Sequence, residues 1–278
     1  MINSVHIVPK LNAQDDPLVL AASNAIKTTA HSLGIKVIGV TSIRPDTLIV
    51  AVGGDGTMLE ALRRSAASGA VALGVNLGNV GFLTEISVIR DAVDGSLAPL
   101  MRQIFSQEID TFVEYRTILT TSPAPDHLAC NEISVSHLHS DTMITYHLRV
   151  GRISAGIHKA NSILISTPTG STAYSLAAGG ALMMPDMEAI QIVPVAPLTL
   201  TSRPLMVGSD CRITIEAWGG GISVRSDGQT ISVADQSFTA DTPYVIEVYA
   251  FPTRAKMLHL AGWNYFNVLS SKLGWIKR

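Results

Sequence analysis

The chain has 278 residues, a length that accommodates one large or two ordinary domains with a substantial core. Only 15% of the residues are charged and the net charge at pH 7 is −2, which excludes the basic surface expected of a nucleic-acid-binding protein. Although 47% of the residues are hydrophobic, no apolar run reaches the roughly 18 residues of a membrane-spanning helix, so we expect neither a nucleic-acid nor a membrane partner.

The N-terminal residues and the cysteines both favour a cytoplasmic location. Residues 1–10 lack a charged segment followed by a long apolar core, so we expect no signal peptide. The two cysteines, Cys130 and Cys211, are far apart in the sequence and form no Cys-x-x-Cys pair. This usage is typical of a reducing compartment and argues against a zinc site.

The first part of the chain alternates between strands and helices. In chain order we expect a strand at residues 5–9, a helix at 16–33, strands at 35–40 and 47–52, a helix beginning near Asp55 and a strand at 71–75. This alternation predicts a Rossmann-like α/β domain with a parallel sheet. Such sheets bind ligands at the carboxyl ends of their strands.

The loop Gly53-Gly54-Asp55-Gly56-Thr57 stands at one such strand end. Glycine lets the backbone approach an anion closely, and the first N–H groups of the next helix point at the ligand, so Gly53, Gly54 and Gly56 are predicted to bind phosphate. Thr57 either caps the helix or bonds a phosphate oxygen. A carboxylate beside phosphate must hold a metal ion or accept a proton, which makes Asp55 the candidate functional residue. The alternative is an ordinary turn, because Gly and Asp favour turns for backbone reasons.

A second glycine-bearing loop, Asn76-Leu-Gly-Asn-Val-Gly-Phe-Leu83, follows the next predicted strand. Two such loops side by side would form a crevice. In that crevice the Phe82 ring would stack on a ligand, unless it belongs to the hydrophobic core.

The sequence changes character after residues 88–107, which have a helical pattern interrupted by Gly95 and Pro99. Short β-branched segments separated by turns predict strands at residues 111–121, 131–137, 143–150, 162–166, 190–195, 211–217, 222–225, 230–233 and 244–251. Strands this frequent without helices between them indicate a β-rich domain.

We therefore predict a two-domain α+β protein. Residues 1–105 form the α/β phosphate-binding domain and residues 106–252 the β-rich domain. The C-terminal tail, residues 253–278, contains a predicted helix at 263–275 and is expected to pack back on the first domain.

Two polar motifs lie in the predicted β-rich domain. Asn131-Glu132 offers an amide and a carboxylate that suit sugar hydroxyls, although a solvated strand end would have the same composition. The run from Ser166 to Ser175 contains six Ser and Thr residues with Pro and Gly among them, and apolar segments flank it. A linker would have this composition as well, but buried hydroxyl groups need partners, which a polar ligand would supply.

Taken together, these motifs resemble those of the NAD kinases in order and approximate spacing. The resemblance covers residues 50–230 and rests on six motifs: Gly53-Gly-Asp-Gly-Thr57, Asn76-Leu-Gly-Asn-Val-Gly-Phe-Leu83, Asn131-Glu132, Thr167-Pro-Thr-Gly-Ser-Thr-Ala-Tyr174, Arg203-Pro204 and Asp227-Gly228-Gln229. The first motif is shared with diacylglycerol and sphingosine kinases, whereas the Thr167 to Tyr174 run is far more specific.

The resemblance implies transfer of the γ-phosphoryl group of ATP, or of polyphosphate, to the 2′-hydroxyl of the adenosine ribose of NAD, which gives NADP. Asp55 would act on that hydroxyl as general base. Mg²⁺ or another divalent cation should accompany the nucleotide, with ligands that the sequence does not assign. The resemblance also implies a homodimer or homotetramer.

The residues that would bind NAD follow from the same resemblance. They are Phe82 against the nucleoside, Glu132 at the ribose hydroxyls, and Asn131, Thr172, Ala173 and Tyr174 at the adenosine part.

Three positions depart from the family pattern. Asn161 stands where many members have an Asp near the nicotinamide, Ala177 replaces a Ser near the adenine, and Ala196-Pro197-Leu198 lacks a usual His. The first two belong to the acceptor pocket. Asn161 keeps an amide but loses the charge, which would alter the preference between NAD and NADH or weaken binding, and Ala177 removes one hydroxyl.

Two other interpretations predict different behaviour. A lipid kinase would share the Gly53 to Thr57 loop, but it would not carry the Thr167 to Tyr174 run. It would also have a basic or amphipathic membrane segment, which we do not find in this sequence. A degenerate dinucleotide-binding regulator, suggested by the three departures, would bind nucleotide without turnover. Asp227 is either a site residue or part of a hairpin, because Asp-Gly is a strong turn signal.

Overall fold

The computed structural model describes residues 2–13, 15–78, 81–87, 95–122, 124–139 and 141–275. The chain forms two compact units. The first unit comprises Met1–Tyr115 and Ala255–Arg278, and the second comprises Arg116–Arg254. Each unit has its own hydrophobic core.

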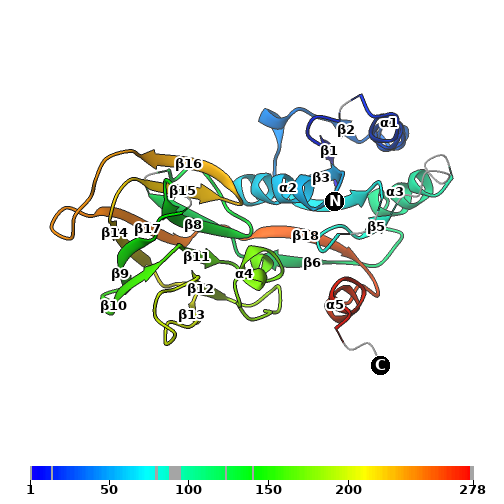
Figure 1. Cartoon of the computed structure of the whole chain (residues 1–278). Coiled ribbons are helices and arrows are strands. Elements are labelled where there is room, and N and C mark those ends of the chain that lie inside the picture. The colour runs from blue at the N-terminus through cyan, green and yellow to red at the C-terminus, as the bar shows by residue number, and fades with distance from the viewer. Residues whose placement is uncertain are drawn as a thin grey trace. The chain divides into compact units, whose positions relative to one another are not determined.

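The described part of the first unit is built on one seven-stranded sheet with the order β2-β1-β3-β4-β18-β6, and β5 pairs with β4 (Figure 1). Its strands are β1 (Ser4–Pro9), β2 (Lys36–Val37), β3 (Thr47–Val52), β4 (Val71–Asn76), β5 (Ile86–Ser87), β6 (Thr111–Arg116) and β18 (Ala255–Leu260). Its helices are α1 (Pro17–Ser32), the 3₁₀ helix η1 (Val40–Ser42), α2 (Asp55–Ser68), α3 (Leu97–Phe105) and α5 (Tyr265–Leu273). The neighbours from β2 to β4 pair in parallel, as predicted, and β18 also pairs in parallel with β4.

Local sequence explains the best-defined elements of this unit. Every residue of β3 is buried, which accounts for its unbroken apolar, β-branched composition. Helix α1 begins after Asp16, whose side chain accepts a hydrogen bond from the Leu18 N–H at 2.8 Å, with Pro17 in the first turn. Helix α2 ends at Gly69, which has a φ of 75°. It packs against β3, β4 and β18 and so supports the centre of the sheet.

Two predicted elements are shorter than expected. The strand predicted at 35–40 is reduced to Lys36–Val37 and is followed by η1, because β2 lies at the sheet edge and pairs with β1 alone among the described strands. The interrupted helix predicted over 88–107 contains α3, in which Pro99 occupies the first turn, where its missing N–H costs no hydrogen bond. Residues 88–94 of that prediction lie outside the described residues.

The prediction of one strand at 111–121 in the β-rich domain is wrong. The segment forms two strands, and the first of them, β6, belongs to the parallel-stranded sheet of the first unit. The strand β18 was not predicted, yet it pairs in parallel with β4. Both strands occupy their positions because of partners distant in the sequence, which local periodicity does not reveal.

The second unit contains two antiparallel sheets. Five strands have the order β10-β9-β14-β17-β7 and six have the order β13-β12-β11-β8-β15-β16 within the described residues. The strands are β7 (Leu119–Ser122), β8 (Glu132–His137), β9 (Ile144–Val150), β10 (Ile153–Ala160), β11 (Ser162–Ser166), β12 (Ala189–Val195), β13 (Leu205–Gly208), β14 (Ile213–Trp218), β15 (Ile222–Ser226), β16 (Gln229–Ala234) and β17 (Tyr244–Ala250). Two short helices, the 3₁₀ helix η3 (Thr169–Thr172) and α4 (Tyr174–Ala177), follow β11.

The core of the second unit follows from alternation along its strands. In β9, for example, Ile144, Tyr146 and Leu148 are buried while the residues between them are more exposed. Sequence analysis missed β10 and β13, which are edge strands with few buried residues and therefore lack this alternation. In the described part of the chain, no helix is long and apolar enough to cross a membrane.

Candidate functional site

The glycine loop of the first unit lies between β3 and α2. An added Cβ at Gly53 would collide with the Thr57 hydroxyl, whereas a Cβ at Gly54 or Gly56 would meet nothing within 4 Å. Gly53 is therefore required by the fold of the loop. Gly54 and Gly56 instead leave open space beside the backbone, which is what a bound anion needs.

Backbone donors face this open space at the start of α2. The N–H groups of Gly54, Asp55 and Gly56 donate to no atom outside the helix within the described residues. Because the first N–H groups of a helix also lack intrahelical acceptors, they remain available to a ligand. Thr57 is buried, and no side chain caps the helix, so the capping role considered for Thr57 is absent.

Asp55 is held by the second glycine-bearing loop. Its Oδ2 accepts a hydrogen bond from the Phe82 N–H at 2.9 Å, and its Oδ1 accepts one from the Leu83 N–H at 3.0 Å. A Cβ at Gly81 would collide with the Asp55 carboxylate. Gly81 of the second loop thus leaves room for the Asp55 carboxylate of the first loop, and the structure brings the two motifs together.

Two buried polar side chains fix the shape of the second loop. Thr84 accepts hydrogen bonds at its hydroxyl from the Gly81 N–H at 2.9 Å and from the Asn76 side-chain amide at 3.0 Å. The Asn76 side-chain oxygen accepts the Gly78 N–H at 3.0 Å. Phe82 is partly buried, and its ring stacks on no other aromatic ring among the described residues.

In the second unit, strand pairing brings the two polar motifs together. Glu132 opens β8 and lies opposite Ser166, the last residue of the neighbouring antiparallel strand β11. The Thr167 N–H donates to the Asn131 carbonyl at 2.9 Å, and the Thr167 hydroxyl donates to the Cys130 carbonyl. A Cβ at Gly170 would collide with the Asn131 carbonyl. The Thr167 to Tyr174 run therefore packs directly on Asn131-Glu132.

Asp227 holds the same segment from the other side. Asp227 and Gly228 have φ values of 45° and 79°, as in the two-residue hairpin turn that joins β15 to β16. The Asp227 carboxylate accepts hydrogen bonds from three consecutive backbone N–H groups, those of Cys130, Asn131 and Glu132, at 2.9, 2.7 and 3.2 Å. Asp227 is thus both a hairpin residue and a part of the site.

Glu132 carries the least satisfied carboxylate of this region. The residue is 6% exposed, and its Oε2 atom is buried without a hydrogen-bond partner. Burial, together with the nearby negative charge of Asp227, raises the pKa of Glu132 to about 7. A ligand hydroxyl reaching Oε2 would supply the missing partner.

The buried hydroxyls after β11 do not need a ligand, contrary to the reasoning from sequence. The Ser171 hydroxyl accepts the Met183 N–H at 3.1 Å, and the Ser175 hydroxyl donates to the Gln191 side chain at 2.8 Å. The Thr172 hydroxyl donates to the Thr169 carbonyl at 3.2 Å. The run is a packed structural element, not a linker. Tyr174, which is 47% exposed, is the side chain that it presents to solvent.

Comparisons with known proteins agree with this arrangement. Residues 45–104 match the family described as ATP-NAD kinase N-terminal domain, and residues 130–239 match the ATP-NAD kinase C-terminal domain. The chain is 36% identical over 236 residues to the NAD kinase of Pasteurella multocida, which covers 83% of this chain and 74% of the relative. It is 31% identical over 266 residues to the NAD kinase of an Acidovorax species, which covers 94% of this chain and 85% of the relative.

The chain belongs to the NAD kinase family. As an NAD kinase it is a phosphotransferase that phosphorylates NAD to NADP, and the resemblance drawn from the sequence motifs is confirmed. Membership also decides against the lipid kinase interpretation.

Solved structures share the fold of this NAD kinase. An NAD kinase from Archaeoglobus fulgidus in complex with ATP superposes with a TM-score of 0.73 at 24% identity, covering 99% of this chain and 100% of that one. Yeast NADH kinase complexed with NADH gives a TM-score of 0.78 at 18% identity, covering 100% of this chain and 89% of that one. The combination of a parallel-stranded sheet with antiparallel sheets is thereby confirmed for the predicted α+β class.

The residues at the departures from the family pattern are spread over the second unit. Asn161 is exposed and precedes β11, so it lies at the opposite end of this strand from Ser166 and Thr167. Ala177, also exposed, ends α4, which follows the Thr167 to Tyr174 run. Ala196 has a φ of 44° immediately before Pro197, a conformation that is unusual for a residue with a side chain. The structure does not bring Asn161 to the Asn131-Glu132 group.

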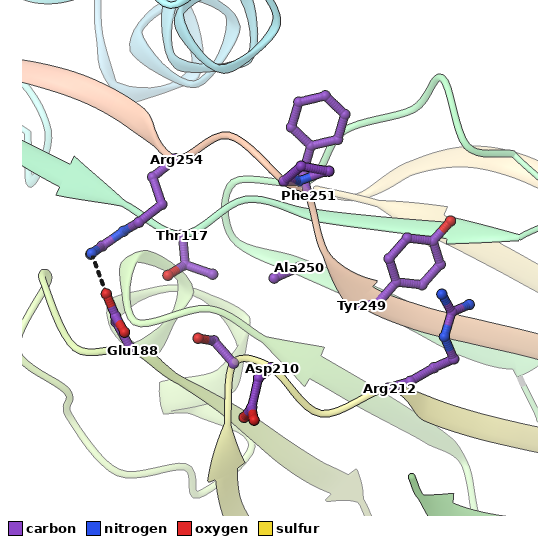
Figure 2. A pocket seen from close by; sticks show the side chains of 10 residues that line it. Thr117, Glu188, Asp210, Arg212, Tyr249, Ala250, Phe251 and Arg254 are labelled. Carbon is purple, nitrogen blue, oxygen red and sulfur yellow. Dashed lines mark hydrogen bonds and ion pairs between the residues drawn. The ribbon is translucent and has the colours of Figure 1, made fainter.

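A separate cavity of about 450 Å³ in the second unit contains none of the predicted site residues (Figure 2). Its two arginines already pair with carboxylates: Arg254 contacts Glu188 at 3.1 Å, and Arg212 contacts Glu247 at 2.7 Å while lying over the Tyr249 ring. These pairs neutralise the charge that an anionic nucleotide would need, so we do not assign the cavity to the NAD kinase site.

Sequence reasoning did not assign a holding role to the residues that keep the site residues in place, although it left Asp227 open as a site residue and included Gly81 in the second loop. Gly81, Thr84 and Asp227 act through backbone groups or through close approach, which a list of reactive side chains does not reveal. The repeated glycine of the second loop was the available signal for Gly81. For Asp227, the Asp-Gly turn signal identified the hairpin but not the three amides that its carboxylate binds.

Proposed function

We propose that the Asp55 carboxylate is the general base of the NAD kinase reaction. The observation that carries this proposal is its position: two backbone amides orient the carboxylate at the first residue of α2, beside the open N–H groups of the glycine loop. In the reaction, the 2′-oxygen of the NAD adenosine ribose forms a bond to the γ-phosphorus of ATP. The bond from that phosphorus to the β-phosphate oxygen breaks, and the hydroxyl proton moves to Asp55.

The glycine loop supplies the electrostatic part of the mechanism. The N–H groups of Gly54, Asp55 and Gly56, at the positive end of the α2 dipole, are suited to the phosphate oxygens of the donor. The buried Thr57 side chain fixes the loop against Gly53. Phosphoryl transfer depends mainly on positioning and charge neutralisation, which this loop provides.

ATP is the donor that we propose, and Mg²⁺ or another divalent cation would accompany it. Among the described residues, no cluster of three or more His, Cys, Asp or Glu side chains forms a ready metal site. Mg²⁺ often binds through substrate phosphates, water and one or two carboxylates, so this chain fits an ion that arrives with ATP, for which Asp55 would be an available carboxylate ligand. The ion would neutralise charge on the transferred phosphoryl group.

We further propose that the second unit binds NAD. Glu132, with its unpartnered Oε2, would accept a hydrogen bond from a ribose hydroxyl or, when protonated, donate one. The side-chain amide of Asn131, together with Thr172, Ala173, Tyr174 and Ala177, would surround the adenosine part. Asn161, at the far end of β11, would lie toward the nicotinamide of the extended dinucleotide.

The assembly and the location of the enzyme are also proposals. The family resemblance supports a homodimer or homotetramer, which the molar mass in solution would establish. The free cysteines Cys130 and Cys211 support a reducing, cytoplasmic location.

Asp55→Asn tests the base assignment. With NAD, ATP and Mg²⁺, we expect kcat for NADP formation to fall by a factor on the order of 100 or more, with ATP affinity largely retained. The control is Asp15→Asn, the same chemical change at an exposed position of the first unit, which should leave kcat unaltered. An Asp55→Asn variant that kept the native kcat would overturn the assignment.

A further inference from the structure

A second carboxylate fastens the loop that holds Asp55. Glu85 follows Leu83 by two residues and reaches strand β18 with both of its oxygens. Its Oε1 accepts a hydrogen bond from the Leu260 N–H at 2.8 Å, and its Oε2 lies 2.9 Å from Nδ1 of His259. The segment from Phe82 to Glu85 is thus anchored at one end to Asp55 and at the other end to β18.

His259 is fully buried inside the first unit. The aromatic rings of Trp263 and Phe112 stack on its imidazole, with centroids 3.8 and 5.2 Å away. Its Nε2 lies 3.8 Å from the Glu114 carboxylate. Burial by itself would lower the pKa of His259, but the negative charges of Glu114 and Glu85 and the hydrogen bond to Glu85 outweigh it and raise the pKa. The imidazole therefore makes a fixed, charge-assisted partner for Glu85.

The segment between the two anchors is too short to absorb a displacement. It spans about 3.3 Å per residue at full extension, so the Leu83 N–H lies only two residues from the Glu85 anchor. The Thr84 hydroxyl, between them, is engaged by the Gly81 N–H and by Asn76. A shift of Glu85 would therefore move the amides that orient Asp55.

We propose that Glu85 and His259 are positioning residues of the NAD kinase reaction, which act by fixing the Phe82 and Leu83 amides that orient the Asp55 carboxylate. This inference rests on the proposed role of Asp55 as the base. Neither residue is assigned a contact with NAD or ATP.

Strand β18 has other anchors, so its place in the sheet does not depend on Glu85. It pairs with β4 through Lys256 and Met257. The Lys256 N–H also donates to the Ser65 hydroxyl at 2.7 Å, and its ammonium group donates to the Gly69 carbonyl at 2.9 Å. Ser65→Ala removes one of these anchors without touching the second loop, which makes it the matched control.

The test compares Glu85→Ala, Glu85→Gln, His259→Gln and Ser65→Ala in the full-length protein. For Glu85→Ala we expect kcat to fall by about 10- to 100-fold, with the KM values for NAD and ATP within about twofold of native, because misplacing a reacting group affects the chemical step. His259→Gln should lose less, since the Leu260 N–H still holds Glu85. Glu85→Gln retains an acceptor for that N–H and should restore part of the loss. Ser65→Ala should lower Tm without lowering kcat.

A double-mutant cycle separates positioning from general stability. Combined with Asp55→Asn, Glu85→Ala should cause no further loss of kcat, because the carboxylate that it orients is absent. Equal fold-losses in the native and Asp55→Asn backgrounds, or a fall in Tm with kcat intact, would overturn the positioning role. If Asp55→Asn itself kept full activity, the base assignment would fail instead, and the two failures would be distinguishable.

Discussion

Each of the two units contains an aspartate carboxylate that accepts hydrogen bonds from consecutive backbone N–H groups, but the proposed roles of the two carboxylates differ. In the first, the Asp55 carboxylate accepts hydrogen bonds from two consecutive backbone N–H groups. In the second, the Asp227 carboxylate accepts hydrogen bonds from three. Asp55 is itself the proposed reacting group, whereas Asp227 orients a neighbour, Glu132, whose own Oε2 has no partner. In these proposed roles, one amide-bound carboxylate reacts and the other positions a neighbour. Open backbone donors lie beside Asp55, whereas a buried second carboxylate, Glu132, lies beside Asp227.

The largest loss of activity should come from a side chain at Gly81, where the backbone closely approaches the Asp55 carboxylate of the first unit. In Gly81→Ala, the new Cβ would collide with the Asp55 carboxylate, so we expect kcat to fall by a factor on the order of 100 or more. Gly54→Ala introduces a Cβ that meets nothing within 4 Å, so in the absence of ligand it should fold as the native protein does. Steady-state kinetics and Tm of both variants check this. Similar kcat values for Gly81→Ala and the native enzyme would break the comparison.

The buried carboxylate of the second unit should make stability depend on pH. Because the pKa of Glu132 is raised from 4.5 to about 7, the folded state keeps a proton that the unfolded state releases between these values. The native stability therefore declines as pH rises through this window. Glu132→Gln, which stays neutral, should match the native protein near pH 4.5 and exceed it by about 3 kcal/mol above pH 7.

Denaturant unfolding of both proteins at pH 5 and pH 8 measures this difference. A constant difference between the two pH values would contradict the raised pKa. The same variant should bind NAD more weakly, because its amide would replace the carboxyl group proposed to meet the ribose.

Removing the Asp227 carboxylate, which positions Asn131-Glu132, should have a smaller effect on stability and on catalysis. Asp227→Asn keeps one acceptor oxygen but turns an NH₂ group toward backbone donors, so we expect a loss of about 2 kcal/mol in the free energy of unfolding. We also expect a higher KM for NAD with the KM for ATP unaltered. Asp241→Asn, at an exposed position of the same unit, is the control. An equal rise in both KM values would mean that Asp227 does not act through Asn131-Glu132.

The smallest effect, a change in the preference between NAD and NADH, is expected from substitution of Asn161. Asn161→Asp restores the carboxylate common in the family at an exposed position, so it should favour the positively charged nicotinamide of NAD over NADH by about threefold. Unfolding stability should not change. The ratio of kcat/KM for NAD and NADH measures the effect, and an unaltered ratio would place Asn161 away from the nicotinamide.

Sequence by itself determined the elements whose signals are local. The buried run of β3, the glycine loop and the start of α2 lie within about a dozen consecutive residues, and the structure has all three. The Thr167 to Tyr174 run and Asn131-Glu132 were likewise found by their composition and order, which was sufficient to identify the family.

Tertiary structure decided how these motifs meet, because their partners are distant in the chain. The amides that hold Asp55 lie 27 and 28 residues away, and those that hold Asp227 lie 95 to 97 residues away. Strand β18, whose His259 contacts Glu85 across 174 residues, has no periodic pattern that reveals its place beside β4. Hydrophobic period and turn chemistry report on neighbours in sequence, whereas burial, unpartnered oxygens and close approach are properties of the packed chain.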